Sequence, residues 1–172
     1  MRPADARGPE PDGGPARSHE PFRARLRPGV LAAVALGGLL GGTARYVLGL
    51  AFPTPAGSFP LTTFAVNVSG SFLLALLLVY VLEVWPPTRY VRAFAGVGFL
   101  GSFTTFSTWM ADTDRLLVHG HLTTAAVNVF GSLAAGLAAT VLGLAVGRLA
   151  SARRARSAAR RGRAPRYGWW VR

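Results

Sequence analysis

The segment Gly98-Phe-Leu-Gly-Ser-Phe-Thr-Thr-Phe-Ser-Thr-Trp109 decides the fold of this chain. It lies within an apolar stretch, residues 91–110, that is long enough to cross a membrane core of about 30 Å. Two glycines beside a run of threonine and serine, at the depth of the membrane centre, predict a helix that breaks there. A break frees backbone groups that lipid cannot satisfy, so protein, water or an ion must meet them. Freed carbonyls at such a break can hold a cation such as Na⁺.

Three more apolar stretches accompany this segment, namely residues 30–52, 61–84 and 122–149. Each is long enough to span the membrane as a helix, and the short connections make consecutive helices antiparallel neighbours. The composition agrees, because 51% of the 172 residues are hydrophobic while the net charge is +12 and every basic residue is arginine. Apolar spans with arginine-rich flanks explain this combination. We therefore predict an all-α integral membrane protein with four transmembrane helices, the third of which is broken.

The apolar stretches divide the chain into three parts. Residues 1–28 have no apolar period, and we predict a disordered N-terminal tail because they cannot bury enough surface to offset the entropy of ordering. Residues 29–149 form the predicted four-helix membrane domain, and residues 150–172 form an arginine-rich tail. Such a tail can bind nucleic acid. Because this one directly follows an apolar helix, we favour anionic membrane lipid as its partner and expect no nucleic acid.

The arginines also predict an orientation in the cell membrane. They gather before the first apolar stretch, between the second and third, and after the fourth, which places them on one side of a four-span protein. An excess of Lys and Arg marks the cytoplasmic side. We therefore expect both termini of this multi-pass protein to be cytoplasmic.

The residue inventory leaves little room for catalysis. The chain has no cysteine, which rules out a disulfide framework, a thiolate zinc site and a cysteine nucleophile. Its three histidines and seven acids lie mostly outside the apolar stretches. We therefore do not expect an enzyme.

The first apolar stretch carries small residues and one charge. Gly37 with Gly41, and Gly38 with Gly42, have the spacing that allows the backbone of another helix to approach closely. Arg45 lies within the span, where a charge is costly, so it faces a partner or a water-filled cavity, or else it snorkels to the interface. In each case it places positive potential near an entrance and favours anions.

Neutral polar residues form two stripes at four-residue spacing. The second apolar stretch carries Thr63, Asn67 and Ser71, and the fourth carries Thr124, Asn128, Ser132, Gly136 and Thr140. Such stripes either form hydrogen bonds between helices or line a pore, and two long stripes favour the pore. Neutral donors suit a small anion, because they replace its hydration shell without trapping it.

Two aromatic residues of the third apolar stretch, Phe106 and Trp109, share a helix face. Aromatic ring edges carry partial positive charge and can contact an anion. The alternative is that these rings only pack between helices.

Four motifs follow one another along the chain. They are Gly-Gly-x-x-Gly-x-x-x-Arg-Tyr from Gly37, Thr-Phe-x-Val-Asn-x-x-Gly-Ser-Phe from Thr63, Gly-x-x-Gly-x-Phe-Thr-Thr-Phe-Ser-Thr from Gly98, and Asn-x-x-x-Ser-x-x-x-Gly from Asn128. In order and spacing they resemble the CrcB/Fluc family of fluoride channels, over about residues 30–149. The third motif is the most specific of the four, and both tails lie outside the resemblance.

The resemblance implies a dimer of antiparallel four-helix subunits with two narrow pores. These pores export fluoride ion passively from the cytoplasm and so reduce its toxicity. The resemblance also implies a structural Na⁺, which is not transported, held at the dimer centre by backbone carbonyls of Gly101 and Thr104. By position, the pore residues fall on Asn67, Phe106, Ser107, Thr108, Trp109, Asn128 and Ser132, and the arginine of the vestibule falls on Arg45.

The chain departs from the family pattern in two respects. Position 109 is Trp, where the family usually has Phe, so the ring is bulkier and adds an N–H. The arginine distribution is one-sided, whereas members encoded by a single gene insert in both orientations and have nearly balanced flanks. We therefore hypothesise that the channel is a heterodimer with an oppositely oriented paralogue.

Two other functions stay open at this point. A proton antiporter of the small multidrug-resistance type also has four helices, but it needs a carboxylate within the membrane. The acid nearest to a span is Glu83, at the end of the second stretch, which argues against this function. The second alternative is a non-conducting subunit that only scaffolds a partner. The polar stripes argue against this function, whereas Trp109 at the pore position is compatible with it.

Overall fold

The computed structural model describes residues 27–81 and 89–160, and this part of the chain is helical apart from short connections. In chain order, its segments are α1 (Pro28–Ala51), α2 (Leu61–Val79), α3 (Arg89–Val91), the π-helical segment η3 (Arg92–Leu100), α4 (Gly101–Phe103), α5 (Phe106–Val118), α6 (Leu122–Ala126), the π-helical segment η4 (Val127–Gly131) and α7 (Ser132–Arg160). The all-helical prediction is therefore confirmed. Residues 1–26 of the predicted N-terminal tail and residues 161–172 of the C-terminal tail lie outside the described residues, and Pro28, the last residue of the predicted tail, begins α1.

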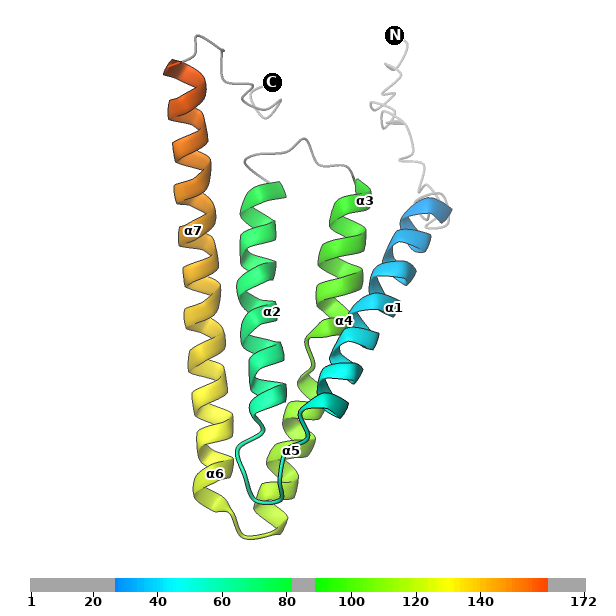
Figure 1. Cartoon of the computed structure of the whole chain (residues 1–172), viewed down its shortest axis with the longest axis vertical. Coiled ribbons are helices and arrows are strands. Elements are labelled where there is room, and N and C mark those ends of the chain that lie inside the picture. Colours follow the sequence, from blue (N-terminus) through cyan, green and yellow to red (C-terminus); the bar gives the residue numbers. More distant parts are fainter. Residues whose placement is uncertain (1–26, 82–88, 161–172) are drawn as a thin grey trace, which may run out of the picture.

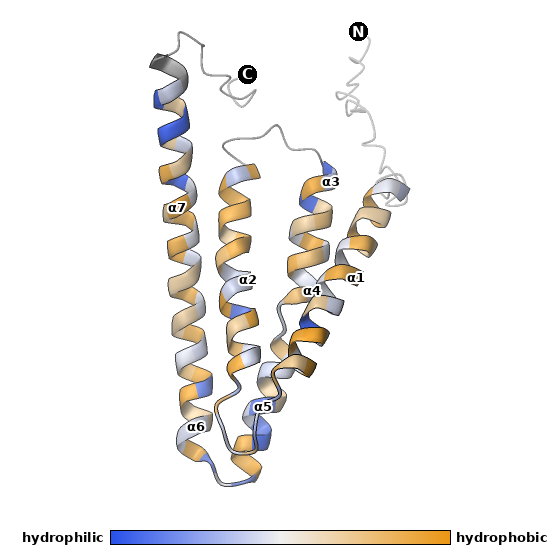
Figure 2. Cartoon of the chain, in the orientation of Figure 1, coloured by the Kyte–Doolittle hydropathy of each residue, from blue (hydrophilic) through white to orange (hydrophobic). Residues whose placement is uncertain are grey.

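The helices run alternately up and down between the two ends of the molecule (Figure 1). Three of them are long and apolar enough to cross a membrane, namely Pro28–Ala51, Leu61–Val79 and Leu122–Ser157. The third predicted span is a composite, because η3, α4 and α5 follow one another across the molecule with an interruption between α4 and α5. Hydrophobic residues dominate the middle of the molecule (Figure 2).

Small residues form much of the interior, whereas many large apolar side chains point outwards. Leu39 is 66% exposed and Leu137 is 61% exposed, while the buried positions include Val66, Ala75 and Ala125. This distribution would be costly in water, where large apolar side chains are driven inside. It suits lipid, in which helices associate through close packing of small residues instead of through burial of large ones.

The predicted glycine contact of the first helix is confirmed for one of its two pairs. A Cβ added at Gly37 or Gly41 would collide with a backbone carbonyl, that of Phe94 or Phe99 respectively, in η3. The second pair differs, because a Cβ at Gly38 would lie 3.2 Å from Ser102 Oγ while one at Gly42 would meet nothing within 4 Å. Only one glycine face of α1 therefore requires the absence of a side chain.

A similar glycine contact joins α7 to α2, and the sequence analysis did not single it out. A Cβ at Gly143 would lie 2.5 Å from the Phe72 carbonyl oxygen, and one at Gly147 would lie 2.8 Å from Val79 Cβ. These two glycines have the same four-residue spacing as Gly37 and Gly41, from which the close contact of α1 was predicted. Together the two contacts divide the subunit into the pairs α1 with η3 and α2 with α7.

The last helix continues past the predicted end of the membrane domain at residue 149, because α7 runs to Arg160. The sequence from Ala150 to Arg160 is mostly alanine and arginine, which are among the strongest helix formers. The first residues of the predicted arginine-rich tail are therefore a helical extension of the membrane-spanning helix.

Candidate functional site

The predicted break of the third span is present and lies between Phe103 and Phe106. Thr104 has φ −72° and ψ 153°, and Thr105 has φ −147° and ψ 122°, so both residues are extended between two helices. The break falls on the two threonines of the motif, after the short helix α4 that Gly101 begins, so a break within this motif is confirmed. It interrupts the backbone hydrogen-bond ladder at this point.

Asn67 of α2 bonds the N–H and the carbonyl of Thr105, the second residue of the break. Its Nδ2 donates to the Thr105 carbonyl oxygen at 2.9 Å, and its Oδ1 accepts from the Thr105 backbone N–H at 2.8 Å. One side-chain amide thus pairs with both polar groups of one residue, as a neighbouring β-strand would do. This contact fixes the position of the break relative to α2.

The break leaves several carbonyls without the donors that a continuous helix would give them, and those of Gly101 and Thr104 are two of them. Gly101 O would accept from the Thr105 N–H, which is bonded to Asn67, and Thr104 O would accept from the Thr108 N–H, which is bonded to Thr105 Oγ1 at 3.2 Å. Both residues are the predicted Na⁺ ligands. Main-chain oxygens released in this way are hard donors of the kind that alkali cations bind at helix breaks, so the donor set fits a Na⁺ ion.

Arg45 supplies a donor for one of the carbonyls between these two residues. Its Nε donates to the Ser102 carbonyl oxygen at 3.1 Å, and the side chain is half-buried. Of the two predicted alternatives, the structure shows a protein partner for the guanidinium. The delocalised positive charge of the guanidinium therefore lies beside the break.

Hydroxyl groups gather at the first turn of α5. Thr105 Oγ1 caps this helix by accepting from the Thr108 N–H, and it also lies 3.0 Å from Thr108 Oγ1 and 3.3 Å from Ser107 Oγ. The predicted pore residues Ser107 and Thr108 are therefore brought together with the break. Thr105 was not among the predicted pore residues, yet its hydroxyl contacts both of them. Its position directly before a helix start is a capping signal in the sequence.

Asn128 of η4 is almost completely buried, with 1% of its surface exposed. Its Nδ2 donates to Thr113 Oγ1 at 2.9 Å, and its Oδ1 accepts from Ser132 Oγ at 3.3 Å. Its backbone carbonyl accepts from the Trp109 indole N–H at 3.0 Å. The predicted residues Trp109, Asn128 and Ser132 are thus joined into one network between α5 and η4, together with Thr113, which sequence reasoning missed.

The two aromatic residues of α5 meet edge to face. The ring centroids of Phe106 and Trp109 are 5.6 Å apart, with an interplanar angle of 76°. Phe106 is 70% exposed on the single chain, whereas Trp109 is half-buried. Most of the Phe106 surface is therefore exposed on the outside of the subunit, whereas the indole of Trp109 is partly covered.

The polar stripes contribute hydrogen bonds between segments at several positions. Thr63 Oγ1 donates to Asp112 Oδ2 of α5 at 2.7 Å. Asn67 and Asn128 likewise donate to residues outside their own helical segments, Thr105 and Thr113. Thr140 bonds within its own helix, to the Gly136 carbonyl oxygen. The interhelical alternative thus holds for these three members of the stripes, and their pore lining stays a prediction.

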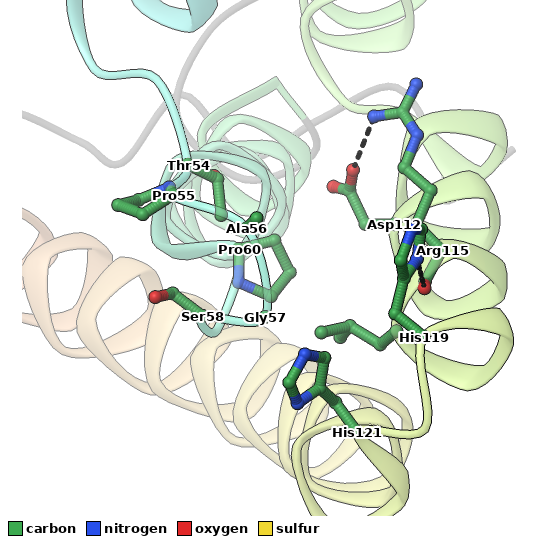
Figure 3. Close-up of a pocket in the computed structure, with 11 residues that line it drawn as sticks. Thr54, Pro55, Ala56, Gly57, Ser58, Pro60, Asp112, Arg115, His119 and His121 are labelled. Carbon is green, nitrogen blue, oxygen red and sulfur yellow. Dashed lines mark hydrogen bonds and ion pairs between the residues drawn. The ribbon is translucent and has the colours of Figure 1, made fainter.

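A cavity of about 180 Å³ lies at the loop end of the subunit, between the α1–α2 connection and the end of α5 (Figure 3). Arg115, His119 and His121 face it, and Arg115 lies 3.6 Å from Asp112. A Cβ at Gly57, which has a φ of 75°, would lie 2.5 Å from His121 Nε2. None of the predicted pore residues lines this cavity.

Comparison with known proteins agrees with the motifs. Residues 32–144 match the family described as "CrcB-like protein, Camphor Resistance (CrcB)". The chain is 82% identical over 151 residues to "Fluoride-specific ion channel FluC 3" of Streptomyces avermitilis, which covers 88% of this chain and 74% of the relative. It is 45% identical over 126 residues to "Fluoride-specific ion channel FluC 2" of Nocardia farcinica, covering 73% of this chain and 90% of the relative.

A more distant relative extends the agreement beyond these two organisms. The chain is 42% identical over 119 residues to "Fluoride-specific ion channel FluC" of Geobacter metallireducens, covering 69% of this chain and 96% of the relative. The region that matches the family, residues 32–144, contains the break, the glycine contact of α1 and the polar networks described above. The chain is therefore a multi-pass membrane protein of the CrcB/FluC fluoride channel family, which is a family of ion channels and not of enzymes.

Proposed function

We propose that this chain forms a passive, fluoride-specific channel that exports F⁻ from the cytoplasm and so reduces fluoride toxicity. The observation that carries the proposal is the broken third span held by Asn67, since it gathers hydroxyl groups, ring edges and one arginine around a single point in the membrane. The family relationship supports it, because the relatives named above are called fluoride-specific ion channels.

In this proposal F⁻ loses its water and is met by neutral donors and ring edges. Ser107, Thr108 and Ser132 offer hydroxyl groups, and Phe106 and Trp109 offer ring C–H edges with partial positive charge. The Asn67 amide has a second N–H that its bonds to Thr105 do not use, because an amide nitrogen carries two hydrogens. That N–H is the one we assign to the ion.

Asn128 has a different part in the proposal. Its amide and carbonyl are engaged with Thr113, Ser132 and Trp109 inside the subunit. We therefore assign it to holding the indole and the Ser132 hydroxyl in place along the ion path. Arg45, which is anchored on the Ser102 carbonyl, supplies the positive potential that draws anions towards the entrance.

The proposal includes a structural Na⁺ that is not transported. The carbonyls of Gly101 and Thr104 would hold it, since both have lost their helical donors at the break. When bound, the ion supplies positive charge that neutralises the released carbonyl dipoles. The chain's own residues at this point keep the break open and correctly placed.

We further propose that the channel is an antiparallel dimer in the cell membrane and that its partner is an oppositely oriented paralogue. The support is the one-sided arginine distribution, which orients this chain with both termini in the cytoplasm. Among the described residues, the acids are Asp112 and Asp114 of α5, near the loop end of the molecule (Figure 1). Asp112 accepts a hydrogen bond from Thr63 and lies 3.6 Å from Arg115, whereas a proton antiporter needs a carboxylate that is free to bind and release protons within the membrane.

Fluoride efflux from liposomes tests the proposal. The chain is reconstituted alone, and together with a FluC-type chain whose arginines are biased to the other side, and external F⁻ is followed with a fluoride electrode after a K⁺ ionophore is added. We expect rapid F⁻ efflux from the mixed vesicles and no Cl⁻ efflux from the same preparation. Absence of F⁻ efflux from both preparations, with dimers present, would identify a scaffolding subunit. Conduction by the chain alone, as a stable homodimer, would contradict the paralogue.

A further inference from the structure

The last helix extends beyond the other spans at the end where the arginines lie (Figure 1). α7 contacts α2 up to the level where Gly147 meets Val79, and it continues as an uninterrupted helix to Arg160. Its sequence after Gly147 includes Arg148, Arg153, Arg154 and Arg156, all of them exposed. A rigid helix therefore carries a set of cations past the apolar part of the subunit.

These arginines lie on two different faces of α7. Leu142 and Leu149 are 56% and 60% exposed and lie seven residues apart on the outer face. Arg153 and Arg156, four and seven residues after Leu149, continue the same face. The outer face of α7 is thus apolar along the membrane and cationic directly above it.

Arg154 belongs to the opposite, inner face. It comes seven residues after Gly147, which packs against α2, and its guanidinium lies 5.5 Å from the centroid of the Tyr80 ring. The same guanidinium approaches the Tyr80 hydroxyl at 3.5 Å. The charge of Arg154 is therefore directed at the neighbouring helix, while those of Arg153 and Arg156 point away from the subunit.

We propose that Arg153 and Arg156 form a binding face for the phosphate groups of anionic phospholipids. At about 1.5 Å per residue, they stand roughly 6 and 10 Å beyond Leu149, which is the depth of the headgroup layer above the hydrocarbon core. The planar guanidinium pairs with phosphate oxygens through two parallel hydrogen bonds. The outer face then contacts acyl chains with its leucines and headgroups of the same lipids with its arginines.

Charge and continuity favour lipid over other occupants. The acids of the described residues, Asp112 and Asp114, lie on α5 towards the opposite end of the molecule, so they cannot neutralise this face (Figure 1). A second copy in antiparallel orientation would carry its own arginines at the other membrane surface, and a parallel copy would oppose like charges. A nucleic acid could contact only the arginines of this face, because the apolar part of the same face lies within the membrane. The inference requires only that α7 crosses the membrane, and it is independent of the ion conducted.

Lipid binding to the full-length chain tests the proposal, with a matched control on the same helix turn. Dioleoyl-phosphatidylglycerol and dioleoyl-phosphatidylcholine are titrated onto the detergent-purified protein, and bound lipid is counted by native mass spectrometry. R153Q and R156Q remove one charge each from the outer face, and R154Q removes one charge from the inner face. We expect each outer substitution to weaken phosphatidylglycerol binding about fivefold and the double substitution roughly 25-fold. R154Q should weaken binding less than about twofold, and R153K/R156K should restore most of it, since the charge is kept.

Three results would overturn the proposal. Equal losses in R153Q, R156Q and R154Q would mean that only net charge matters and that the outer face is not a site. Equal binding of the two lipids by the unmodified chain would mean that the headgroup charge is not recognised. Displacement of phosphatidylglycerol by a short DNA duplex at lower concentration than by free phosphatidylglycerol would make nucleic acid the partner. Thermal unfolding of each variant, measured in the same detergent, shows that the comparison is between folded proteins.

Discussion

The side-chain amide of Asn67 is bonded to both backbone groups of Thr105, at 2.9 and 2.8 Å. Asn67 lies on α2 and Thr105 in the break between α4 and α5, and the contact takes the place of a helical bond that the break removes. An extended residue within a membrane needs such a partner, because lipid offers none. The stability of the broken third span and the position of its hydroxyl cluster therefore depend on one side chain of α2.

Substitution of Asn67 tests this dependence. N67A leaves the N–H of Thr105 without its partner, which costs about 1–3 kcal/mol, whereas the Thr105 carbonyl, as the N-cap of α5, can still accept the first helical bond. We expect a lower thermal unfolding temperature in detergent and loss of fluoride efflux. S69A on the same helix is the control, because Ser69 Oγ bonds the Ala65 carbonyl oxygen of its own helix at 2.6 Å. If N67A were as stable as S69A, the amide would not support the break.

Two adjacent glycines of α1 provide a matched test of helix packing. G41A places a methyl group against the Phe99 backbone carbonyl, whereas G42A places the same group where nothing lies within 4 Å. We expect G41A to lower the free energy of unfolding by about 3 kcal/mol, since a rigid carbonyl must move. G42A should raise it by up to about 1 kcal/mol through helix propensity. Equilibrium unfolding in mixed micelles measures both, and equal effects of the two substitutions would refute the close contact.

Replacement of the indole separates its hydrogen bond from its ring edge. W109F removes the donor to the Asn128 carbonyl oxygen and keeps an aromatic ring beside Phe106. We expect the free energy of unfolding to fall by only about 0.5–1.5 kcal/mol, because the Asn128 carbonyl loses one hydrogen bond but keeps the one from the Ser132 backbone N–H. Fluoride efflux should persist, since the indole N–H is engaged with Asn128 and is not offered to the ion. Loss of efflux in a folded W109F protein would show that the N–H itself takes part in conduction.

The charge of Arg45 and its bond to the Ser102 carbonyl can be separated by two substitutions. R45M removes both, and R45K keeps the charge without the fixed geometry of the guanidinium. We expect R45M to slow fluoride efflux by about tenfold, because local positive potential concentrates anions at an entrance. R45K should keep most of the rate, and its efflux should respond to ionic strength as that of the unmodified chain does. Equal rates of fluoride efflux in the unmodified chain, R45M and R45K would show that Arg45 takes no part in conduction.

Much of the fold follows from local patterns along the chain. Apolar length predicts the spans, and Gly98 and Gly101 beside Thr104 and Thr105 predict where the third one breaks. The four-residue spacing of Gly37 and Gly41 predicts a close helix contact. It could not tell this pair from Gly38 and Gly42, since both pairs have the same spacing and only packing decides which face meets η3. For the same reason the spacing of polar residues could not choose between a pore and bonds between helices.

The sequence by itself determined that this chain spans a membrane, where its third span breaks and which family it belongs to, because apolar length, helix-breaking residues and motif spacing are properties of consecutive residues. Only the tertiary structure decided which donor meets which acceptor. Asn67 pairs with Thr105, Arg45 with Ser102 and Trp109 with Asn128, across separations of 38, 57 and 19 residues. Such partners are set by how the helices rotate and cross when small residues let them approach, and that rotation is fixed only by the packing of the whole subunit.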